Sequence, residues 1–390
     1  MPVPLHRTVR SLGLVSLLTD ASSEMIYPLL PAFLTGPLRA GPAFLGVVEG
    51  LAEAVAAFVK IASGRLSDRL KRRKPLVVAG YSLSSVVRPT VALASAPVHV
   101  LAIRVLDRVG KGVRGAPRDA LVAEIVPRSD RGRAFGFQRA MDHAGAFVGP
   151  LLATAVLLVA PGNLRLVFGL AAIPAVLAVA ILVLGVREEP RAAPPLAHVP
   201  VAACVPLEPG LVRYLVVVAV FTLGNSSDAF LLLRAQDVGV ALAFVPALWS
   251  LHHLVKAGAS TWGGALSDRI GRRRTILFGW GVYALAYAGF AVAASALAVT
   301  ALFVFYGLFH ALTEGAERAL VADLAGEAVR GRAFGLFHAV TGAALLPASL
   351  LTGLLWQRFG AATALGAGAV LAGVAALGLL ALVPEPAARS

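Results

Sequence analysis

Seven ionisable residues lie close together in one otherwise apolar stretch of the chain. They are Arg104, Asp107, Arg108, Lys111, Arg114, Arg118 and Asp119. At about 100° per residue of an α-helix they fall within an arc of roughly 140°, so one face carries both cations and anions. Such a face either lines a cavity that binds an anionic substrate or passes charge, or it forms a lattice of ion pairs that tethers helices. The sequence leaves both interpretations open.

Carboxylates in the first two apolar stretches are candidate partners for these cations. They are Asp20, Glu24, Glu49 and Glu53. Whether such a carboxylate takes up a proton depends on whether apolar groups or an arginine surround it. Competition between a substrate and a proton for one carboxylate is a physical basis of proton coupling. The four residues are therefore our candidate proton sites, and permanent ion pairing with Arg108, Lys111 or Arg114 is the alternative.

Polar residues also interrupt the second half of the chain. Asn225, Ser226, Ser227 and Asp228 break one apolar run, and His252, His253 and Lys256 share a face of the next. Adjacent histidines diverge by about 100° on a helix, unlike ligands four residues apart, so we expect a cavity role and no metal site. The full set of candidate cavity residues is Asp20, Glu24, Glu49, Glu53, Lys60, Arg104, Asp107, Arg108, Lys111, Arg114, Arg139, Asp142, Asn225, Asp228, His253 and Lys256.

The composition places these charges in a membrane. The 390 residues are 58% hydrophobic and 14% charged, against about 25% charged in a soluble domain. The net charge of +14 is spread over short loops between apolar runs, which is how membrane topology is encoded and not how nucleic acid is bound. The single cysteine, Cys204, rules out an internal disulfide.

Apolar runs of about 20 residues or more predict twelve membrane-spanning helices. They lie near 10–34, 42–63, 75–95, 98–125, 132–159, 164–186, 211–235, 240–263, 275–296, 298–323, 331–357 and 361–383. We therefore expect an all-α polytopic membrane protein with two pseudo-symmetric six-helix halves, 1–186 and 211–390. The proline-rich segment 187–210 between them is read as a linker.

Two pairs of segments repeat at an offset of about 200 residues. Gly64–Arg73 resembles Gly264–Arg273, and Ala120–Gly136 resembles Ala319–Gly335. Two homologous membrane halves with a basic loop at the same place are the layout of a transporter. Lys and Arg crowd these loops, whereas the opposite loops carry scattered charges such as Arg39, Arg165 and Arg358. The positive-inside rule then places both termini and the linker in the cytoplasm.

These motifs resemble the major facilitator superfamily along the whole chain. The family's loop motif, Gly-x-x-x-Asp-Arg/Lys-x-Gly-Arg/Lys-Arg/Lys, is complete from Gly264 to Arg273, and its first copy has Lys71 in place of the second glycine. The resemblance implies charged loops that latch the halves together on the cytoplasmic side. The gate residues that the resemblance implies are Gly64, Asp68, Arg69, Arg73, Glu124, Arg131, Gly264, Asp268, Arg269, Arg273, Asp323 and Arg330. In the internal repeat Glu317 and Arg318 match Arg118 and Asp119, and we expect Arg118, Glu317 and Arg318 to face the cavity or this gate.

Two further motifs resemble those of family members. Arg108, with Lys111 where a glutamine is usual, matches a buried arginine that the family ties to proton coupling. Gly145, Gly149 and Pro150 resemble the helix 5 motif of exporters, in which glycines allow close helix approach and proline makes a bend.

We therefore expect a secondary transporter that moves a small solute by alternating access, with proton-coupled efflux as the leading hypothesis. Import or facilitated movement of an organic anion is the alternative, and a non-transporting membrane enzyme or sensor is a third hypothesis. No phosphate-binding loop is found in the sequence, so we expect a proton gradient and neither ATP nor a cofactor. The expected partners are a small-molecule substrate and the lipid bilayer, with no nucleic acid, and the expected form is a monomer in the plasma membrane.

Overall fold

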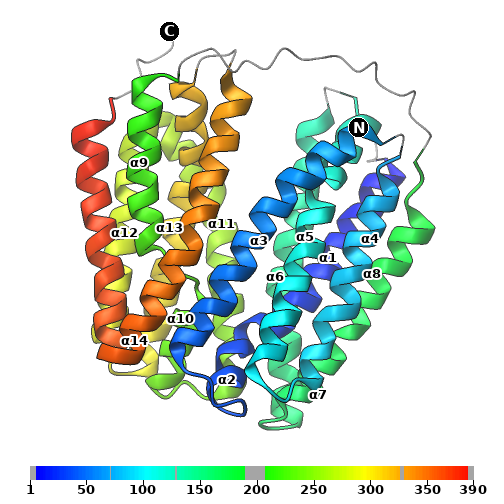
Figure 1. Ribbon diagram of the computed structural model, residues 1–390, viewed down its shortest axis with the longest axis horizontal. Helices are drawn as coiled ribbons and strands as arrows, with labels where there is room; N and C mark the ends of the chain where they lie inside the picture. Colours follow the sequence, from blue (N-terminus) through cyan, green and yellow to red (C-terminus); the bar gives the residue numbers. More distant parts are fainter. Residues whose placement is uncertain (1–5, 71, 128–129, 189–206, 326–328, 385–390) are drawn as a thin grey trace. The chain divides into compact units, whose positions relative to one another are not determined.

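The structure is a computed structural model that describes residues 6–70, 72–127, 130–188, 207–325 and 329–384. The side chains of Asp68 and Arg330 lie outside this description. Across the described ranges the chain is helical and contains no β-strand. Figure 1 shows that the long helices within each half of the chain run side by side.

The first half of the chain forms six spans. Their elements are α1 (Arg7–Ile26), η1 (Tyr27–Leu29), α2 (Leu30–Thr35), α3 (Pro42–Arg69), α4 (Lys74–Val87), η2 (Arg88–Leu93), α5 (Pro97–Ile125), α6 (Arg131–Val159), α7 (Leu164–Leu170) and α8 (Ala172–Gly185). The first, third and sixth spans each combine two or three of these elements.

The second half forms the other six spans. Their elements are α9 (Pro209–Gly224), α10 (Ala229–Asp237), η4 (Leu242–Phe244), α11 (Val245–Ile270), α12 (Arg272–Val292), α13 (Ala296–Leu324) and α14 (Arg330–Leu382). Helix α14 holds two spans, because Gly360 at φ +85° breaks it between the eleventh and twelfth. A positive φ is readily adopted by glycine, which has no Cβ. The predicted all-α fold with twelve spans is confirmed.

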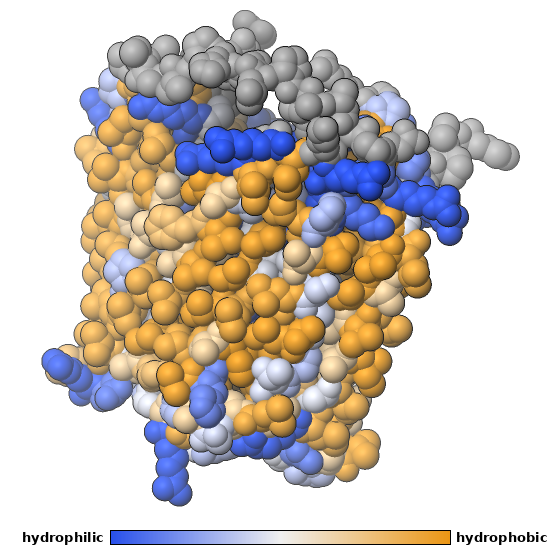
Figure 2. All heavy atoms as spheres, turned by 45° about the vertical axis from the view of Figure 1, so that its right-hand side comes forward, coloured by the Kyte–Doolittle hydropathy of each residue, from blue (hydrophilic) through white to orange (hydrophobic). Residues whose placement is uncertain are grey.

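Within the described residues, seven segments are long and apolar enough on their own to cross a bilayer. The last of them, Gly331–Leu382, contains two spans. The long helices outside this set are α1, α3, α5 and α11, which carry most of the intramembrane charges named above. Figure 2 shows an apolar face with hydrophilic residues gathered near its two ends.

Contacts divide the chain into two compact units. Unit 1 is Met1–Ala40, Leu51–Leu196 and Ala241–Ser250, and unit 2 is Gly41–Gly50, Ala197–Val240 and Leu251–Ser390. Most of the predicted linker, at 189–206, lies outside the described residues.

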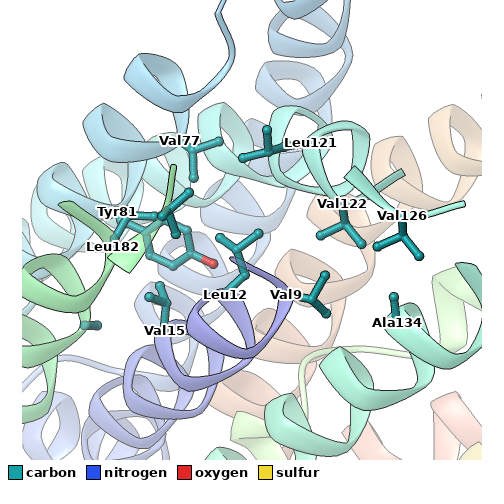
Figure 3. Close-up of a cluster of buried hydrophobic side chains, with 12 residues drawn as sticks. Val9, Leu12, Val15, Val77, Tyr81, Leu121, Val122, Val126, Ala134 and Leu182 are labelled. Atoms are coloured by element: carbon teal, nitrogen blue, oxygen red, sulfur yellow. The ribbon is translucent and has the colours of Figure 1, made fainter. Parts of the chain in front are cut away.

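Unit 1 is built on the packing of α1 against α6 and α8, and of α4 against α5. Its core includes Val9 and Leu12 of α1, Tyr81 of α4 and Val122 of α5 (Figure 3). Gly149 of α6 lies against the backbone of Ala21 in α1, where a Cβ would come within 2.9 Å of Ala21 Cα. This close approach gives Gly149, part of the exporter-like glycine motif and located on α6, a packing role.

Unit 2 packs α9 on α14, and α12 on α13 and α14. Buried aromatic rings join these helices: Phe221 of α9 stacks on Trp280 of α12 with ring centroids 4.4 Å apart. Phe309 of α13 lies edge-on to Tyr283 of α12 at 5.0 Å. Aromatic pairs of this kind add to the free energy of burial, so they stabilise the packing of α9, α12 and α13.

Candidate substrate and proton site

The ionisable side chains on the polar face of α5 contact residues of several neighbouring helices. Asp107 is 1% exposed, and its Oδ1 accepts hydrogen bonds from Arg88 Nη2 at 2.9 Å and Nε at 3.1 Å. Arg88 Nη1 also donates to the carbonyl oxygen of Thr19 at 3.0 Å. A buried carboxylate in a bilayer needs such compensation, so Arg88 and Asp107 connect α1, the α4–η2 junction and α5.

Two further arginines, both on α5, lie near the same Asp107 carboxylate. Arg104 and Arg108 lie 3.9 and 3.7 Å from Asp107 Oδ2, and Arg108 Nε also lies 2.9 Å from Glu53 Oε1 of α3. The Arg104 guanidinium is 5.6 Å from the centre of the Tyr27 ring. These three charged residues of α5 are therefore held by ion pairs, as the lattice interpretation expects.

Lys111 differs from its neighbours on the same face. Its side chain is exposed, and no hydrogen-bond acceptor or carboxylate within the described residues lies close enough to pair with it. Lys60 of α3 is likewise exposed and has no such partner in the described chain. These two lysines supply positive charge that no described residue neutralises by direct contact.

The last turns of α5 contact other helices. Arg114 is buried with its guanidinium 4.2 Å from the centre of the Tyr81 ring of α4. Arg118 donates to Asp119 Oδ1 and to Ser16 Oγ of α1, at 3.0 and 3.1 Å. Asp142 of α6 lies 3.9 Å from Arg118 and 4.0 Å from Arg139.

The two carboxylates of α1 have different surroundings. Glu24 Oε2 accepts a hydrogen bond from Trp249 Nε1 at 2.8 Å, and the Trp249 ring lies 5.4 Å from that of Tyr27. Asp20 is half-buried and has no hydrogen bond or ion pair with any described residue. Its nearby charges include Lys111 and Asp142. Of the four predicted proton sites, Asp20 is the one left without a direct partner in the described structure.

In unit 2 the predicted polar interruption breaks a helix. Residues Asn225–Ser227 are not helical, and Asp228 precedes the start of α10 at Ala229. Ser227 Oγ donates to Glu49 Oε2 at 3.3 Å, and Tyr306 Oη of α13 donates to Asp228 Oδ1 at 2.7 Å. Discontinuous membrane helices expose backbone groups to a ligand, so this break is a candidate binding region.

Charged residues of α11 and α13 continue this polar region. Lys256 Nζ lies 3.5 Å from Glu314 Oε2, and Arg318 Nη2 lies 3.3 Å from Glu314 Oε1. Glu317 accepts a hydrogen bond from Trp280 Nε1 at 3.0 Å. His253, predicted to face a cavity, lies beside His252 with ring centroids 5.7 Å apart.

Several predicted gate residues form ion pairs within their own unit, and in unit 2 their partner is Arg272, which was not among the predicted gate residues. In unit 1, Arg73 Nη1 lies 3.2 Å from Glu124 Oε1. In unit 2, Arg272 lies 2.5 Å from Asp268 Oδ1 and 3.7 Å from Asp323 Oδ2. The side chain of Arg330, another predicted gate residue, lies outside the described residues.

Four other predicted gate residues, Arg69, Arg273, Gly64 and Gly264, form none of the ion pairs described above. Arg273 donates to the carbonyl oxygens of Leu379 and Leu380, and the Arg69 side chain is exposed. Gly64 has room for a Cβ, which would lie 3.5 Å from Ala116 Cβ, and nothing lies within 4 Å of such an atom at Gly264. Neither glycine is therefore required for close packing in this structure.

Sequence reasoning missed two residues. Arg88 is a single charge in an apolar span, and that isolation was the signal that could have found it. Glu188, after α8, accepts from the backbone N–H groups of Arg73 and Lys74 at 2.6 and 2.8 Å and so caps α4. Asp268 Oδ1 accepts a hydrogen bond from Arg272 Nη1, and the Asp68 side chain lies outside the described residues.

Comparison with known proteins decides the family. The profile of the major facilitator superfamily matches residues 12–251 and 214–390. This chain belongs to the major facilitator superfamily. An MFS-type transporter of Methanocaldococcus jannaschii is 36% identical over 360 residues, covering 90% of this chain and 89% of that protein.

Two other proteins are similar to this chain, one over part of its length and the other in fold. The multidrug resistance protein MdtH of Cronobacter sakazakii is 32% identical over 169 residues, which cover 42% of this chain and 41% of that protein. The crystal structure of the nucleoside transporter NupG has a TM-score of 0.78 and 13% identity, covering 97% of this chain and 99% of that one. The second likeness shows the fold alone. Membership of the superfamily makes the chain a multi-pass membrane transporter.

Proposed function

We propose that this transporter exports a small solute in exchange for protons. The observation that carries the proposal is Asp20, a half-buried carboxylate of a membrane-spanning helix without a hydrogen bond or ion pair in the described structure. Such a group exchanges a proton without first breaking an ion pair. Glu53 differs, because Arg108 holds it at 2.9 Å. The partial likeness to a multidrug resistance protein supports export.

In this proposal the charges of α5 have two roles. Arg104, Asp107 and Arg108 form a fixed scaffold with Arg88, because separating buried partners would leave an uncompensated charge. Lys111 is exposed and interacts with Asp20 through space. Substrate binding near Lys111 then changes the electrostatic environment of Asp20, and the proton and the substrate compete.

Facilitated movement or import of an organic anion is the second candidate. It is favoured by Lys60 and Lys111, two exposed cations on membrane-spanning helices with no acidic partner at contact distance among the described residues. An anionic substrate would supply the missing negative charge.

Everted membrane vesicles separate the two candidates. With an acidic lumen imposed, a proton-coupled exporter should accumulate its solute in the lumen and raise the luminal pH, which a fluorescent pH probe reports. The solutes to screen are a panel of fluorescent organic cations and organic anions. Asp20→Asn should abolish the pH change but leave the protein inserted. Solute movement that ignores the imposed gradient in wild-type vesicles would favour the facilitator and contradict proton exchange.

We also propose that the protein lies in the plasma membrane with both termini in the cytoplasm. The support is the crowding of Arg and Lys in the loops that hold Arg73 and Arg272. In a Cys204→Ser background, Gly162→Cys should react with an impermeant thiol reagent added to intact cells. Ala193→Cys should react only after the cells are made permeable. The opposite labelling pattern would invert the topology.

The ion pairs of the loops are proposed gate contacts. Arg272→Gln removes the link to Asp268 and Asp323, all of which lie at the surface of unit 2. Surface pairs add little to stability, about 0–1 kcal/mol, so the variant should fold. The transport rate of Arg272→Gln should fall if these ion pairs close a gate. A wild-type rate would show that the loop arginines only set the membrane topology.

A further inference from the structure

Three residues with metal-binding side chains meet in unit 2 from three different elements. Asp228 lies at the break between α9 and α10, His252 lies on α11 and His310 lies on α13. One potential ligand atom from each lies within 4.8 Å of the other two. The histidine pair of the sequence analysis, His252 and His253, is not the pair that meets here.

We propose that Asp228, His252 and His310 bind a divalent first-row transition-metal ion, for which Zn²⁺ is the best chemical match. Two imidazoles and one carboxylate suit zinc and its neighbours in the first row, whereas Ca²⁺ and Mg²⁺ prefer sets of oxygen ligands. Three protein ligands leave a coordination position open for water or a substrate.

The separation of the three groups is compatible with a metal ion. Ligand bonds of about 2.0–2.2 Å in a tetrahedral site place ligand atoms roughly 3.4 Å apart. Since the three atoms already lie within 4.8 Å of one another, each has to move by less than about 1 Å, which side-chain rotation can provide.

Neighbouring groups orient two of the ligands. Tyr306 Oη donates to Asp228 Oδ1 at 2.7 Å, and the Tyr306 ring stacks on the His252 ring at 5.2 Å. His252 is 1% exposed, and its Nδ1 lies 3.3 Å from the carbonyl oxygen of Phe303. A hydrogen bond from Nδ1–H to this carbonyl leaves Nε2 with a lone pair for a metal, an arrangement common around metal-bound histidines.

The third ligand has a buried atom that lacks a hydrogen bond. His310 Nε2 is inaccessible to solvent and has no hydrogen-bond partner among the described residues. Burying an unsatisfied polar group costs about 1–3 kcal/mol, so such an atom calls for an explanation. The His310 ring lies 5.4 Å from the His252 ring and 5.2 Å from the Tyr306 ring, which places it in the same cluster.

The positive charge of Lys256, one helical turn from the proposed site, is offset by Glu314. Lys256 and Glu314 lie four residues after His252 and His310 on the same two helices, and their charges pair at 3.5 Å. Because Glu314 offsets the Lys256 charge, this lysine does not have to be neutralised by the Asp228 carboxylate.

The test uses the purified full-length transporter with any affinity tag removed. Wild-type protein should bind one equivalent of Zn²⁺ in titration calorimetry, and Co²⁺ should give the intense visible absorption of a four-coordinate site. Neither Ca²⁺ nor Mg²⁺ should compete. His252→Gln, His310→Gln and Asp228→Asn should each abolish the Co²⁺ spectrum. Tyr306→Phe keeps all three ligands and should weaken Zn²⁺ binding about 10- to 100-fold, as loss of an orienting hydrogen bond does.

His253→Gln is the matched control, since it removes the adjacent imidazole on α11 and leaves the three proposed ligands intact. It should bind Zn²⁺ as wild type does. Elution as a single monodisperse peak shows that each variant is folded. The proposal is wrong if folded wild-type protein binds no Zn²⁺, or if His310→Gln and His253→Gln bind it equally well. These readouts do not depend on transport, so they stand apart from the test of proton-coupled efflux.

Discussion

Arg108 of α5 and Glu53 of α3 form an ion pair with 2.9 Å between Nε and Oε1. The arginine side chain is 8% exposed and the glutamate side chain 36%, so the pair lies at the edge of a buried network. Because Asp107 also approaches Arg108, at 3.7 Å, the guanidinium bridges two carboxylates from different helices.

This pair should show energetic coupling. Arg108→Gln and Glu53→Gln should each lower the thermal stability, and the double variant should lose less than the sum of the two. For contacting charges we expect a coupling energy of about 0.5–3 kcal/mol. Thermal unfolding of the detergent-solubilised variants measures it. Strict additivity would show that the contact contributes nothing.

Lys111, unlike Arg108 and Glu53, should contribute little to stability. Because no described residue pairs with it, Lys111→Gln should change the stability by less than about 0.5 kcal/mol, as for exposed positions. It should nevertheless abolish the response to substrate in the vesicle assay, and Lys111→Arg should retain that response since the charge remains. A clear loss of stability in Lys111→Gln would assign the residue to the ion-pair lattice.

Arg88 should contribute strongly to the stability of the protein. Arg88→Gln leaves Asp107 buried at 1% exposure with only the more distant Arg104 and Arg108, so we expect a loss of about 3 kcal/mol. Adding Asp107→Asn should restore part of this loss, because the stranded charge is removed. Lys60→Gln is the control, because it removes a cation with no ion-pair partner among the described residues. Equal stability of Arg88→Gln and this control would contradict the assignment.

Gly149 and Gly136 provide a matched pair on α6. A Cβ at Gly149 would meet the backbone of Ala21, whereas nothing lies within 4 Å of one at Gly136. Gly149→Ala should therefore destabilise the protein by about 1–3 kcal/mol through overpacking. Gly136→Ala should be neutral or stabilise by up to about 1 kcal/mol, because alanine favours a helix. Thermal unfolding measures the stability of both variants. An equal change in stability would contradict a packing role for Gly149.

The sequence by itself determined the fold class, the twelve spans and the break at Asn225–Asp228. These properties are local: about 20 apolar residues must cross the bilayer, and basic loops mark the ends of spans. Helical periodicity also placed the charges of α5 on one face. The family resemblance identified from the loop motifs was confirmed over the whole chain.

Only the tertiary structure decided which charges meet. Periodicity states the direction of a side chain on its own helix, but the neighbour in that direction depends on how the helices pack. Arg88 and Asp107 come from different spans, and so do Glu53 and Arg108. Asp228, His252 and His310 come together because the broken seventh span, α11 and α13 place one residue each at the same point. No spacing along one helix encodes that meeting, so the sequence could not show it.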